Sequence, residues 1–201
     1  MPKIETTGRL FFSLLGKTLR DSELEALLPV AKAELDGHEG DVLKIELNDT
    51  NRPDLWSAAG IVRLLKSYEK EEVVLYDFFS TADETFDSEG RSLIIDASVK
   101  EVRPFSIGFA ARGHKVSEDD LEALIQSQEK LCSNFGRKRK TIAMGIYRSD
   151  LIKYPVHYRG ADPDTTSFVP LGMEQELTLR QICTEHPKGK EYGPIVSGHK
   201  L

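Results

Sequence analysis

Four consecutive basic residues, from Arg137 to Lys140, are the clearest candidate for a binding site in this chain of 201 residues. Lysine and arginine neutralise phosphate groups, and each neutralised phosphate of a nucleic acid adds salt-dependent affinity because counterions are released. A solvated helix C-terminus, where cations complement the helix dipole, explains a short basic run about equally well. Because Arg148, Lys153 and Arg159 follow closely, we slightly favour contact with RNA. The candidate RNA-binding residues are Arg137, Lys138, Arg139 and Lys140.

A second candidate is a metal site, because Cys183 and His186 stand three residues apart on a predicted helix. A structural zinc site needs four ligands and a catalytic one usually three, and no second pair has a suitable spacing. Cys132 is too distant from Cys183 for a disulfide framework, and we expect free, buried thiols. The chain also has no His-Glu-x-x-His helix, no phosphate-binding glycine loop and no readable Ser/His/Asp order. We therefore expect no metal and no cofactor here, and assign no catalytic residue.

The segment NDTNRPDLWSAAGIVRLL contains a third group of polar residues. Pro53 suits the first turn of a helix, since its φ is fixed and its missing N–H would have no partner there. Asp54 then places a negative charge near the positive end of the helix dipole. Arg52 and Arg63 can pair with carboxylates, but nothing in the segment indicates a nucleophile or a base. The start of a capped helix explains this motif without catalysis.

Hydrophobic periodicity predicts the elements that position these residues. In the first part of the chain, DSELEALLPVA has Ser22 and Glu25 at the spacing of a capping box and predicts a helix. GDVLKIELND alternates with a period of two, which predicts a half-buried strand with Leu43, Ile45 and Leu47 on one face. Short strands that alternate with helices indicate a mixed αβ module.

The second part of the chain contains further predicted strands and helices. RSLIIDASV and RPFSIGFAARG are predicted strands, the second with Phe105, Ile107 and Phe109 on one face. SEDDLEALIQSQEKL is the clearest helix, with Ser117 opening a capping box and an end expected near Gly136. KTIAMGI is a predicted strand, and YPVHYRG is predicted to be a strand or a loop edge. TLRQICTEH is a predicted short helix that the following proline ends. The last dozen residues show no packing pattern.

Composition and charge indicate a soluble, folded protein. The chain is 39% hydrophobic and 30% charged, and its net charge of −6 argues against a protein that coats nucleic acid over its whole surface. No apolar run approaches the roughly 20 residues that span a bilayer, and the N-terminus lacks the order of a secretory signal. We therefore predict a cytoplasmic location and no membrane partner. The acidic segment from Glu69 to Glu101, with ten acidic and three basic residues, contains TADETFDSEG, an expected exposed connection. A domain boundary near residue 90 would separate domains 1–90 and 91–201.

Five blocks, in a fixed order, cover nearly the whole chain: NDTNRPDLWSAAGIVR, RPFSIGFAARG, LIQSQEKLCSNFGRKRKTIAMGI, FVPLGMEQELTLRQI and HPKGKEYGPIV. In these blocks the sequence resembles the N-terminal part of the β subunit of phenylalanyl-tRNA synthetases of the archaeal and eukaryotic type. The resemblance implies an α+β fold, with a small mixed αβ N-terminal module followed by part of a mixed αβ editing domain of the B3/B4-like type.

The same resemblance implies a function and partners. The complete enzyme of this family is a heterotetramer of two α and two β subunits that joins phenylalanine to tRNA(Phe) with ATP and magnesium. Its β subunit hydrolyses tyrosine mischarged on that tRNA, while synthesis takes place in the α subunit. Family β subunits continue far beyond residue 201, so the resemblance implies a fragment with an incomplete second module. Relatives usually have His-Asp-Leu-Asp where this chain has Tyr147 to Asp150, so no role is carried over to these residues.

Two other functions fit the same sequence. The first is a non-catalytic RNA-binding or assembly module in which the basic run contacts phosphates. The second is a freestanding hydrolase that acts in trans on mischarged tRNA. Release of tyrosine from mischarged tRNA by this chain alone would favour the second.

Overall fold

The computed structural model describes residues 3–48, 51–73, 89–113 and 115–197. It mixes helices and strands, as predicted, and falls into two compact units. Unit 1 consists of Met1–Glu84 and Gly113–Ile146, and unit 2 of Thr85–Arg112 and Tyr147–Leu201. The expected exposed connection TADETFDSEG lies, apart from its last two residues, outside the described residues, and the boundary near residue 90 stays a prediction. No helix of the described ranges is long and apolar enough to cross a membrane.

Unit 1 is built on an antiparallel sheet with the strand order β1-β3-β2. Its strands are β1 (Lys3–Thr7), β2 (Ala33–Glu39) and β3 (Val42–Leu47). The central strand β3 has the predicted alternation, with Leu43, Ile45 and Leu47 buried and the residues between them half-buried. Ile45 lies opposite Ile4 of β1 and Leu35 of β2. The period-two pattern therefore predicted this strand and its buried face correctly.

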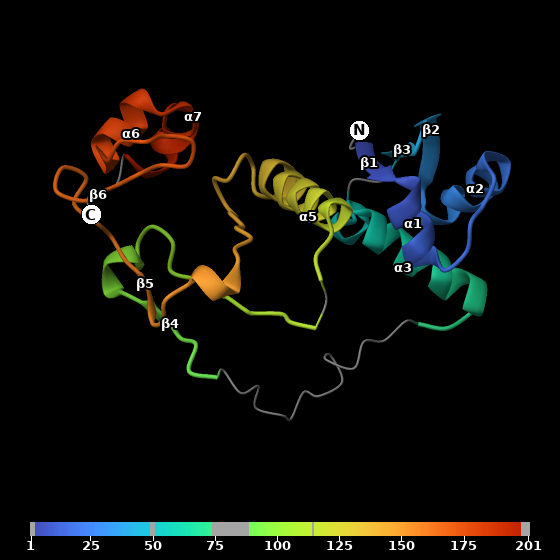
Figure 1. The fold of residues 1–201 in the computed structure, drawn as a ribbon, viewed down its shortest axis with the longest axis horizontal. Coiled ribbons are helices and arrows are strands. Elements are labelled where there is room, and N and C mark those ends of the chain that lie inside the picture. The colour runs from blue at the N-terminus through green and yellow to red at the C-terminus, as the bar shows by residue number, and fades with distance from the viewer. Residues whose placement is uncertain (1–2, 49–50, 74–88, 114, 198–201) are drawn as a thin grey trace. The chain divides into compact units, whose positions relative to one another are not determined.

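Helices gather beside this sheet (Figure 1). They are α1 (Gly8–Leu15), α2 (Asp21–Leu27) and α3 (Ala58–Lys70), with short 3-10 turns η1 (Leu28–Ala31) and η2 (Pro53–Leu55). The predicted capping box of α2 is wrong: Ser22 lies inside the helix, and the N–H of Arg20 donates to Glu23 Oε2 at 2.8 Å. The extended backbone of Arg20 sets the helix start at Asp21, so the acidic partner is Glu23, two residues closer to the N-terminus than the predicted Glu25.

The segment around Pro53 also differs in detail from the prediction. Pro53 begins only the 3-10 turn η2, and the α-helix starts at Ala58 after Ser57, whose hydroxyl accepts from the N–H of Gly60 at 3.1 Å. Serine is a strong N-cap residue because its side-chain oxygen satisfies an amide that has no partner within the helix. Pro53 and Ser57 therefore divide the expected single helix into two elements.

The core of unit 1 is apolar and continuous. It joins the inner face of the sheet to α1, α2 and α3, so burial rather than helix propensity holds these short helices. Its buried members are Ile4, Phe11, Leu15, Leu24, Leu28, Ala31, Ala33, Leu43, Ile45, Leu47, Leu55, Trp56, Ala58, Ile61, Val62 and Leu65.

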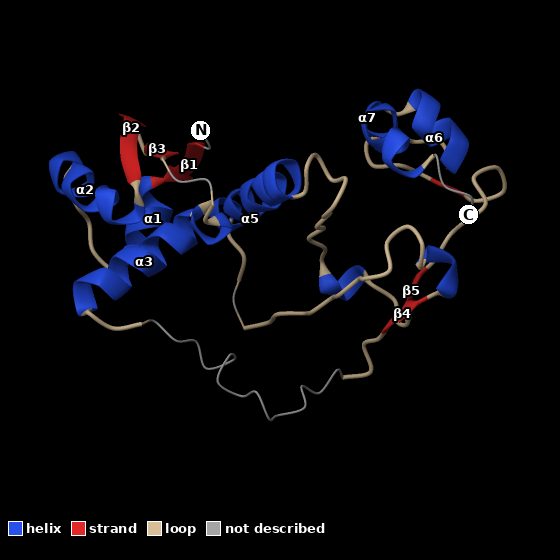
Figure 2. Cartoon of the chain, turned by 180° about the vertical axis from the view of Figure 1, so that it is seen from behind, coloured by secondary structure: helices blue, strands red, loops and turns tan. Residues whose placement is uncertain are grey.

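Helix α5 (Glu118–Lys130) lies beside the edge strand β1 (Figures 1 and 2). Gln126 joins it to the edge, because its side chain accepts from the N–H of Glu5 at 3.1 Å and donates to the carbonyl of Glu5 at 2.8 Å. Arg9 adds an ion pair with Asp119 at 2.8 Å. The helix and its capping box of Ser117 and Asp120 are confirmed. Its apolar residues Leu121, Leu124 and Ile125, however, are exposed.

Unit 2 contains two small sheets and a pair of helices. β4 (Leu93–Ile95) pairs in parallel with β5 (Val156–Tyr158), and β6 (Ser167–Phe168) pairs antiparallel with β7 (Leu177–Thr178). Short turns η3 (Ala97–Val99) and η5 (Ser149–Leu151) accompany them. Helix α6 (Leu179–Glu185) confirms the helix predicted in TLRQICTEH.

The C-terminal segment was expected to lack packing, which is wrong, because α7 (Pro187–Val196) packs against α6. Pro187 ends α6 and also begins α7, since proline suits the first turn of a helix. The contact depends on small residues: a Cβ on Gly189 would lie 1.7 Å from the carbonyl oxygen of Ile182. A pattern of apolar residues could not reveal a contact that glycines make.

Two predicted strands are absent from the described ranges. RPFSIGFAARG runs without strand pairing, and Phe105, Ile107 and Phe109 are 92%, 93% and 92% exposed. KTIAMGI is not a strand either. Both segments have the alternation and residue types of strands, but a strand also requires hydrogen bonds to a neighbour, which these two do not find in the described part of the chain.

Candidate nucleic-acid interface

The basic run forms a tight turn directly after helix α5. A π-helical turn η4 (Leu131–Phe135) continues α5, and Gly136 follows it, so the predicted helix end near Gly136 is confirmed. The next three residues, Arg137, Lys138 and Arg139, all have left-handed backbone conformations, with φ of 50°, 57° and 66°. We call Arg137–Lys140 the basic turn.

Backbone hydrogen bonds hold the basic turn in this unusual conformation. The N–H groups of Arg137, Lys138 and Arg139 donate to the carbonyls of Asn134, Ser133 and Cys132 at 3.1, 2.9 and 2.9 Å. Left-handed conformations are unfavourable for residues with a Cβ, and they persist where the surrounding structure fixes them. Because these amides already have partners, a phosphate bound here must be held by side chains.

Gly136 is required for this turn to form. A Cβ at this position would lie 2.4 Å from the carbonyl oxygens of both Cys132 and Ile142. Contacts of that length do not occur, so any other residue would move the backbone apart. The sequence GRKRK therefore combines a glycine that permits the turn with the cations that the turn presents.

The side chains of the basic turn divide into two kinds. Arg137, Lys138 and Lys140 are exposed, as a phosphate contact requires. Arg139 instead folds back onto α5, where its guanidinium pairs with Glu129 at 2.6 Å and its side chain is only 18% exposed. Sequence reasoning did not find the role of Glu129, because no helical or strand period relates residues ten positions apart across a turn. Arg139 positions the turn, while the other three cations face solvent.

A depression of about 610 Å³ adjoins the basic turn. Ser133 and Asn134, whose carbonyls accept from the turn, line it together with Lys130 of α5. Burial lowers the pKa of Lys130 from its ordinary value. Glu5 and Glu129 also line this depression, so its charge is mixed.

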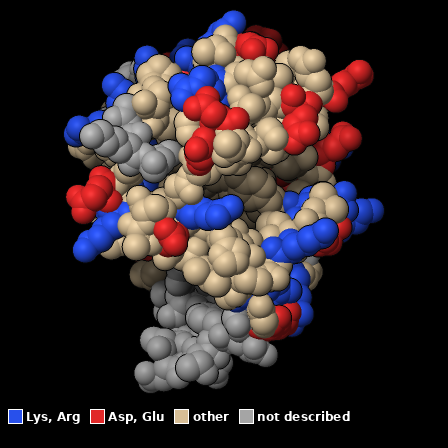
Figure 3. Space-filling view, turned by 90° about the vertical axis from the view of Figure 1, so that its left-hand side faces the viewer, with Lys and Arg blue, Asp and Glu red and all other residues tan. Residues whose placement is uncertain are grey.

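The other basic residues of the predicted cluster belong to unit 2. Arg148 is paired with Asp150 through hydrogen bonds of 3.2 and 2.6 Å, and this guanidinium lowers the pKa of the Asp150 carboxyl. On the face drawn in Figure 3, lysines and arginines are interspersed with aspartates and glutamates. The basic turn is therefore the better candidate for an anion contact than the segment around Arg148.

Cys183 and His186 are engaged in packing and capping. His186 caps α7, because its Nδ1 accepts from the N–H of Lys188 at 3.2 Å while Nε2 lies 3.2 Å from the carbonyl oxygen of Leu171. A Cβ on Gly193 would lie 3.2 Å from Cys183 Sγ, so this thiol packs closely against α7. Within the described ranges, no three His, Cys, Asp or Glu side chains gather as metal ligands.

The polar residues around Pro53 form an ion-pair cluster. Arg52 donates to both oxygens of Asp54 at 2.9 and 2.8 Å, and Arg63 of α3 reaches the same carboxylate at 3.3 Å. The hydrogen bond from Arg52 lowers the pKa of Asp54, and the charge of Arg63 adds to this effect. The predicted pairing of both arginines with a carboxylate is confirmed. The arrangement fixes η2 against α3 and contains no group suited to catalysis.

Comparison with known proteins gives a consistent result. No family model matches this sequence. The chain is 46% identical over 198 residues to the phenylalanine–tRNA ligase β subunit of Borreliella afzelii, and 45% identical over 199 residues to that of Borrelia turicatae. Each alignment covers 98% of this chain but 35% of the relative, so the chain spans about a third of the length of these relatives.

A solved structure has the same fold. The crystal structure of an N-terminal fragment of the phenylalanyl-tRNA synthetase β subunit from Pyrococcus horikoshii matches with a TM-score of 0.88 and 35% identity. The match covers 98% of this chain and 56% of that fragment. Sequence and fold thus point to the same kind of protein.

Proposed function

The chain is homologous to the N-terminal region of phenylalanine–tRNA ligase β subunits, and we propose that it serves as that region within a longer β subunit. The observation that carries this proposal is similarity along nearly the whole chain: 46% identity over 98% of its residues. A short shared motif would not distinguish common function from common local structure, whereas agreement across both units argues for a common role.

In this proposal the complete protein is an aminoacyl-tRNA synthetase of the cytoplasm. Two such β subunits assemble with two α subunits, and the enzyme joins phenylalanine to tRNA(Phe) with ATP and magnesium. The α subunit supplies the synthetic site. This chain would therefore contribute structure and contacts to tRNA rather than hold the nucleotide of the synthetic reaction.

We also propose that the second predicted module is part of an editing domain that removes tyrosine from tRNA(Phe). A pocket for phenylalanine rejects an added hydroxyl only modestly, whereas a second pocket that hydrogen-bonds the hydroxyl selects tyrosine strongly. The exposure of Phe105, Ile107 and Phe109 supports an incomplete module. Single exposed apolar residues are common on folded domains, but a group of large ones in one short segment is not. Further chain would cover them in the complete subunit.

The test uses the complete β subunit co-expressed with its α subunit, beside the 201-residue chain alone. The complex should charge tRNA(Phe) with phenylalanine and release tyrosine from tyrosyl-tRNA(Phe), while the chain alone should do neither. Absence of charging by the assembled complex would overturn the proposed function. Efficient release of tyrosine by the chain alone would instead favour the freestanding hydrolase.

A second proposal is that Arg137, Lys138 and Lys140 contact phosphates of the bound tRNA. Two observations support this proposal. The three side chains are exposed, and hydrogen bonds fix the backbone of the turn that carries them. The test replaces all three by glutamine, and the matched control replaces three exposed lysines elsewhere, Lys70, Lys100 and Lys190. Loss of the turn cations should weaken tRNA binding and reduce the slope of log affinity against log salt by about three, roughly one per lost contact. Equal slopes for the two triple variants would remove this proposal.

A further inference from the structure

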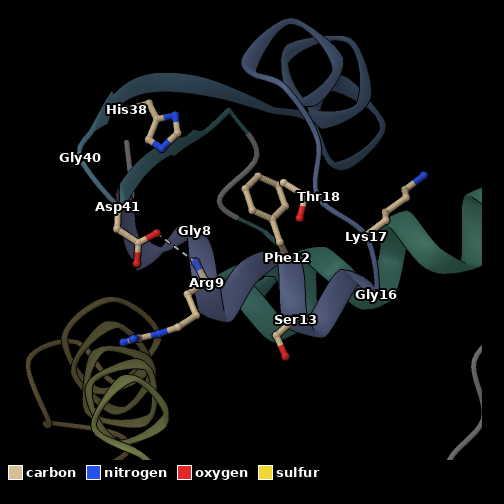
Figure 4. A pocket seen from close by; sticks show the side chains of 10 residues that line it. All are labelled: Gly8, Arg9, Phe12, Ser13, Gly16, Lys17, Thr18, His38, Gly40 and Asp41. Atoms are coloured by element: carbon tan, nitrogen blue, oxygen red, sulfur yellow. Dashed lines mark hydrogen bonds between the residues drawn. The ribbon is translucent and has the colours of Figure 1, made fainter.

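A depression of about 770 Å³ lies in unit 1 between helix α1 and the turn that joins β2 to β3. Phe12 of α1 and Lys17, which follows α1, border the depression on one side (Figure 4). His38 of β2 and Asp41 of the β2–β3 turn border it on the other side. Neither the basic turn nor the ion pairs around Asp54 take part in it.

Phe12 provides an aromatic surface in this depression. In Figure 4 its ring projects into the hollow, between His38 and Thr18. The ring is half-buried and packs edge-to-face against Phe11, with 5.8 Å between the ring centroids. A ring held in this way is already ordered, so a planar ligand could stack on it with little loss of side-chain entropy.

Cations border the same depression. Arg9 pairs with Asp119 at 2.8 Å, and Lys17 pairs with Glu69. The imidazole of His38 also borders the depression, and its Nδ1 lies 2.7 Å from Asp21 Oδ1. The carboxylate partners are partly exposed, and ion pairs of that kind contribute little to stability, so these pairs can rearrange. The pairs also hold the cations around the rim.

Asp41 limits where an anion can bind. Its backbone carbonyl accepts from the N–H of Gly8 at 2.6 Å, and its carboxylate accepts from the N–H of Arg9 at 3.2 Å. The first amides of α1 are thus satisfied, and a phosphate has to bind to side chains. A carboxylate at this position is suited instead to accept a hydrogen bond from an amino group of a base.

We propose that this depression binds one unpaired nucleotide, with its base stacked on Phe12 and its phosphate against Lys17. An aromatic face combined with cations is the arrangement by which proteins bind single-stranded nucleic acid without strong sequence preference. Thr18 lines the same hollow beside the Phe12 ring, and its hydroxyl can bond the edge of the base or the sugar. The nucleotide is either a free mononucleotide or an unpaired position of an RNA.

The test is binding of adenosine monophosphate and of a fluorescein-labelled hexaadenylate to the 201-residue chain, followed by NMR shifts and by anisotropy. Backbone signals around Ser13, Lys17 and Gly40 should move on addition of either ligand. Phe12→Leu keeps an apolar contact with the core and should weaken binding about tenfold, because it removes stacking. Tyr68→Leu replaces an exposed aromatic residue outside the depression and should leave affinity unchanged.

Lys17→Gln is a surface variant that keeps the fold, and it should reduce the salt slope of hexaadenylate binding by about one. Lys70→Gln is its control. Binding of the mononucleotide alone assigns a free nucleotide as the ligand, and binding of the hexamer alone assigns RNA. Failure of both ligands to bind at millimolar concentration overturns the proposal. The proposal is also overturned if Phe12→Leu leaves the affinity unchanged and Lys17→Gln leaves the salt slope unchanged.

Discussion

Gly60 of helix α3 lies against the backbone carbonyl of Asp54, and a Cβ at Gly60 would stand only 1.6 Å from that oxygen. The 3-10 turn η2 therefore passes directly over the first turn of α3. Ser57 completes the arrangement, since its hydroxyl accepts from the N–H of Gly60 at 3.1 Å. A glycine in a helix costs stability relative to alanine, so its presence here reflects close approach of the two elements.

Gly60→Ala should destabilise the chain by about 3 kcal/mol, the upper end of the usual cost of inserting a group into a filled space, because the obstructing atom belongs to the backbone. Urea unfolding at neutral pH measures the change. Gly37→Ala in strand β2 is the matched control, since its added Cβ would find no atom closer than 3.8 Å. Equal midpoints for the two variants would contradict the close approach.

Asp54→Asn should flatten the acid dependence of stability. The Arg52 hydrogen bond holds the pKa of the Asp54 carboxyl below its ordinary value of 3.8, so near that pH the folded chain binds fewer protons than the unfolded chain. Its stabilisation is thus complete above the ordinary pKa and is lost as pH falls through the lower, folded value. Because the side chains are partly exposed, the loss at neutral pH should stay below about 1 kcal/mol.

The measurement for Asp54→Asn is urea unfolding between about pH 2 and pH 6 for both proteins. Other carboxyls titrate in both, so their contributions cancel in the difference. The gap in free energy of unfolding should be widest near pH 6 and should narrow on acidification. A gap that stays constant would show that the pair with Arg52 does not matter for stability.

Elements that depend on local pattern could be predicted from the sequence. Strand β3 and helix α5 were found because alternation and a capping box lie within the element itself. The segment around Phe105 has the same alternation, but pairing depends on a neighbour that no local pattern specifies. Helix α7 was missed for the opposite reason, since its contact with α6 depends on Gly189 and Gly193 rather than on an apolar stripe.

The candidate interface could be predicted only in part. Charge alone pointed to Arg137–Lys140 but could not distinguish a cation that faces solvent from one that holds the turn. That distinction depends on the left-handed conformations after Gly136, which direct Arg139 back to Glu129. Left-handed backbone at three consecutive residues with side chains is rare enough that composition would not suggest it.

Arg139→Gln and Arg137→Gln should therefore have different effects. The first breaks the pair with Glu129 and should lower the free energy of unfolding by roughly 1 kcal/mol, because Glu129 remains half-exposed. The second removes an exposed cation and should change stability by less than about 0.5 kcal/mol. Thermal or urea unfolding of the two variants checks this order. A larger loss for Arg137→Gln would reverse the assignment of the two arginines.

Ile45→Ala and Phe105→Ala test which apolar residues form a core within this chain. Ile45 is fully buried at the centre of the sheet, and its truncation should cost about 2 to 5 kcal/mol, through lost burial and the cavity left behind. Phe105 is 92% exposed, and its truncation should leave unfolding of the 201-residue chain within about 0.5 kcal/mol of the parent. In a complete β subunit, where we propose that further chain covers this segment, Phe105→Ala should instead be clearly destabilising. Denaturant unfolding of both variants in both proteins gives the comparison. A cost for Phe105→Ala that is equally small in the complete subunit would count against an incomplete second module.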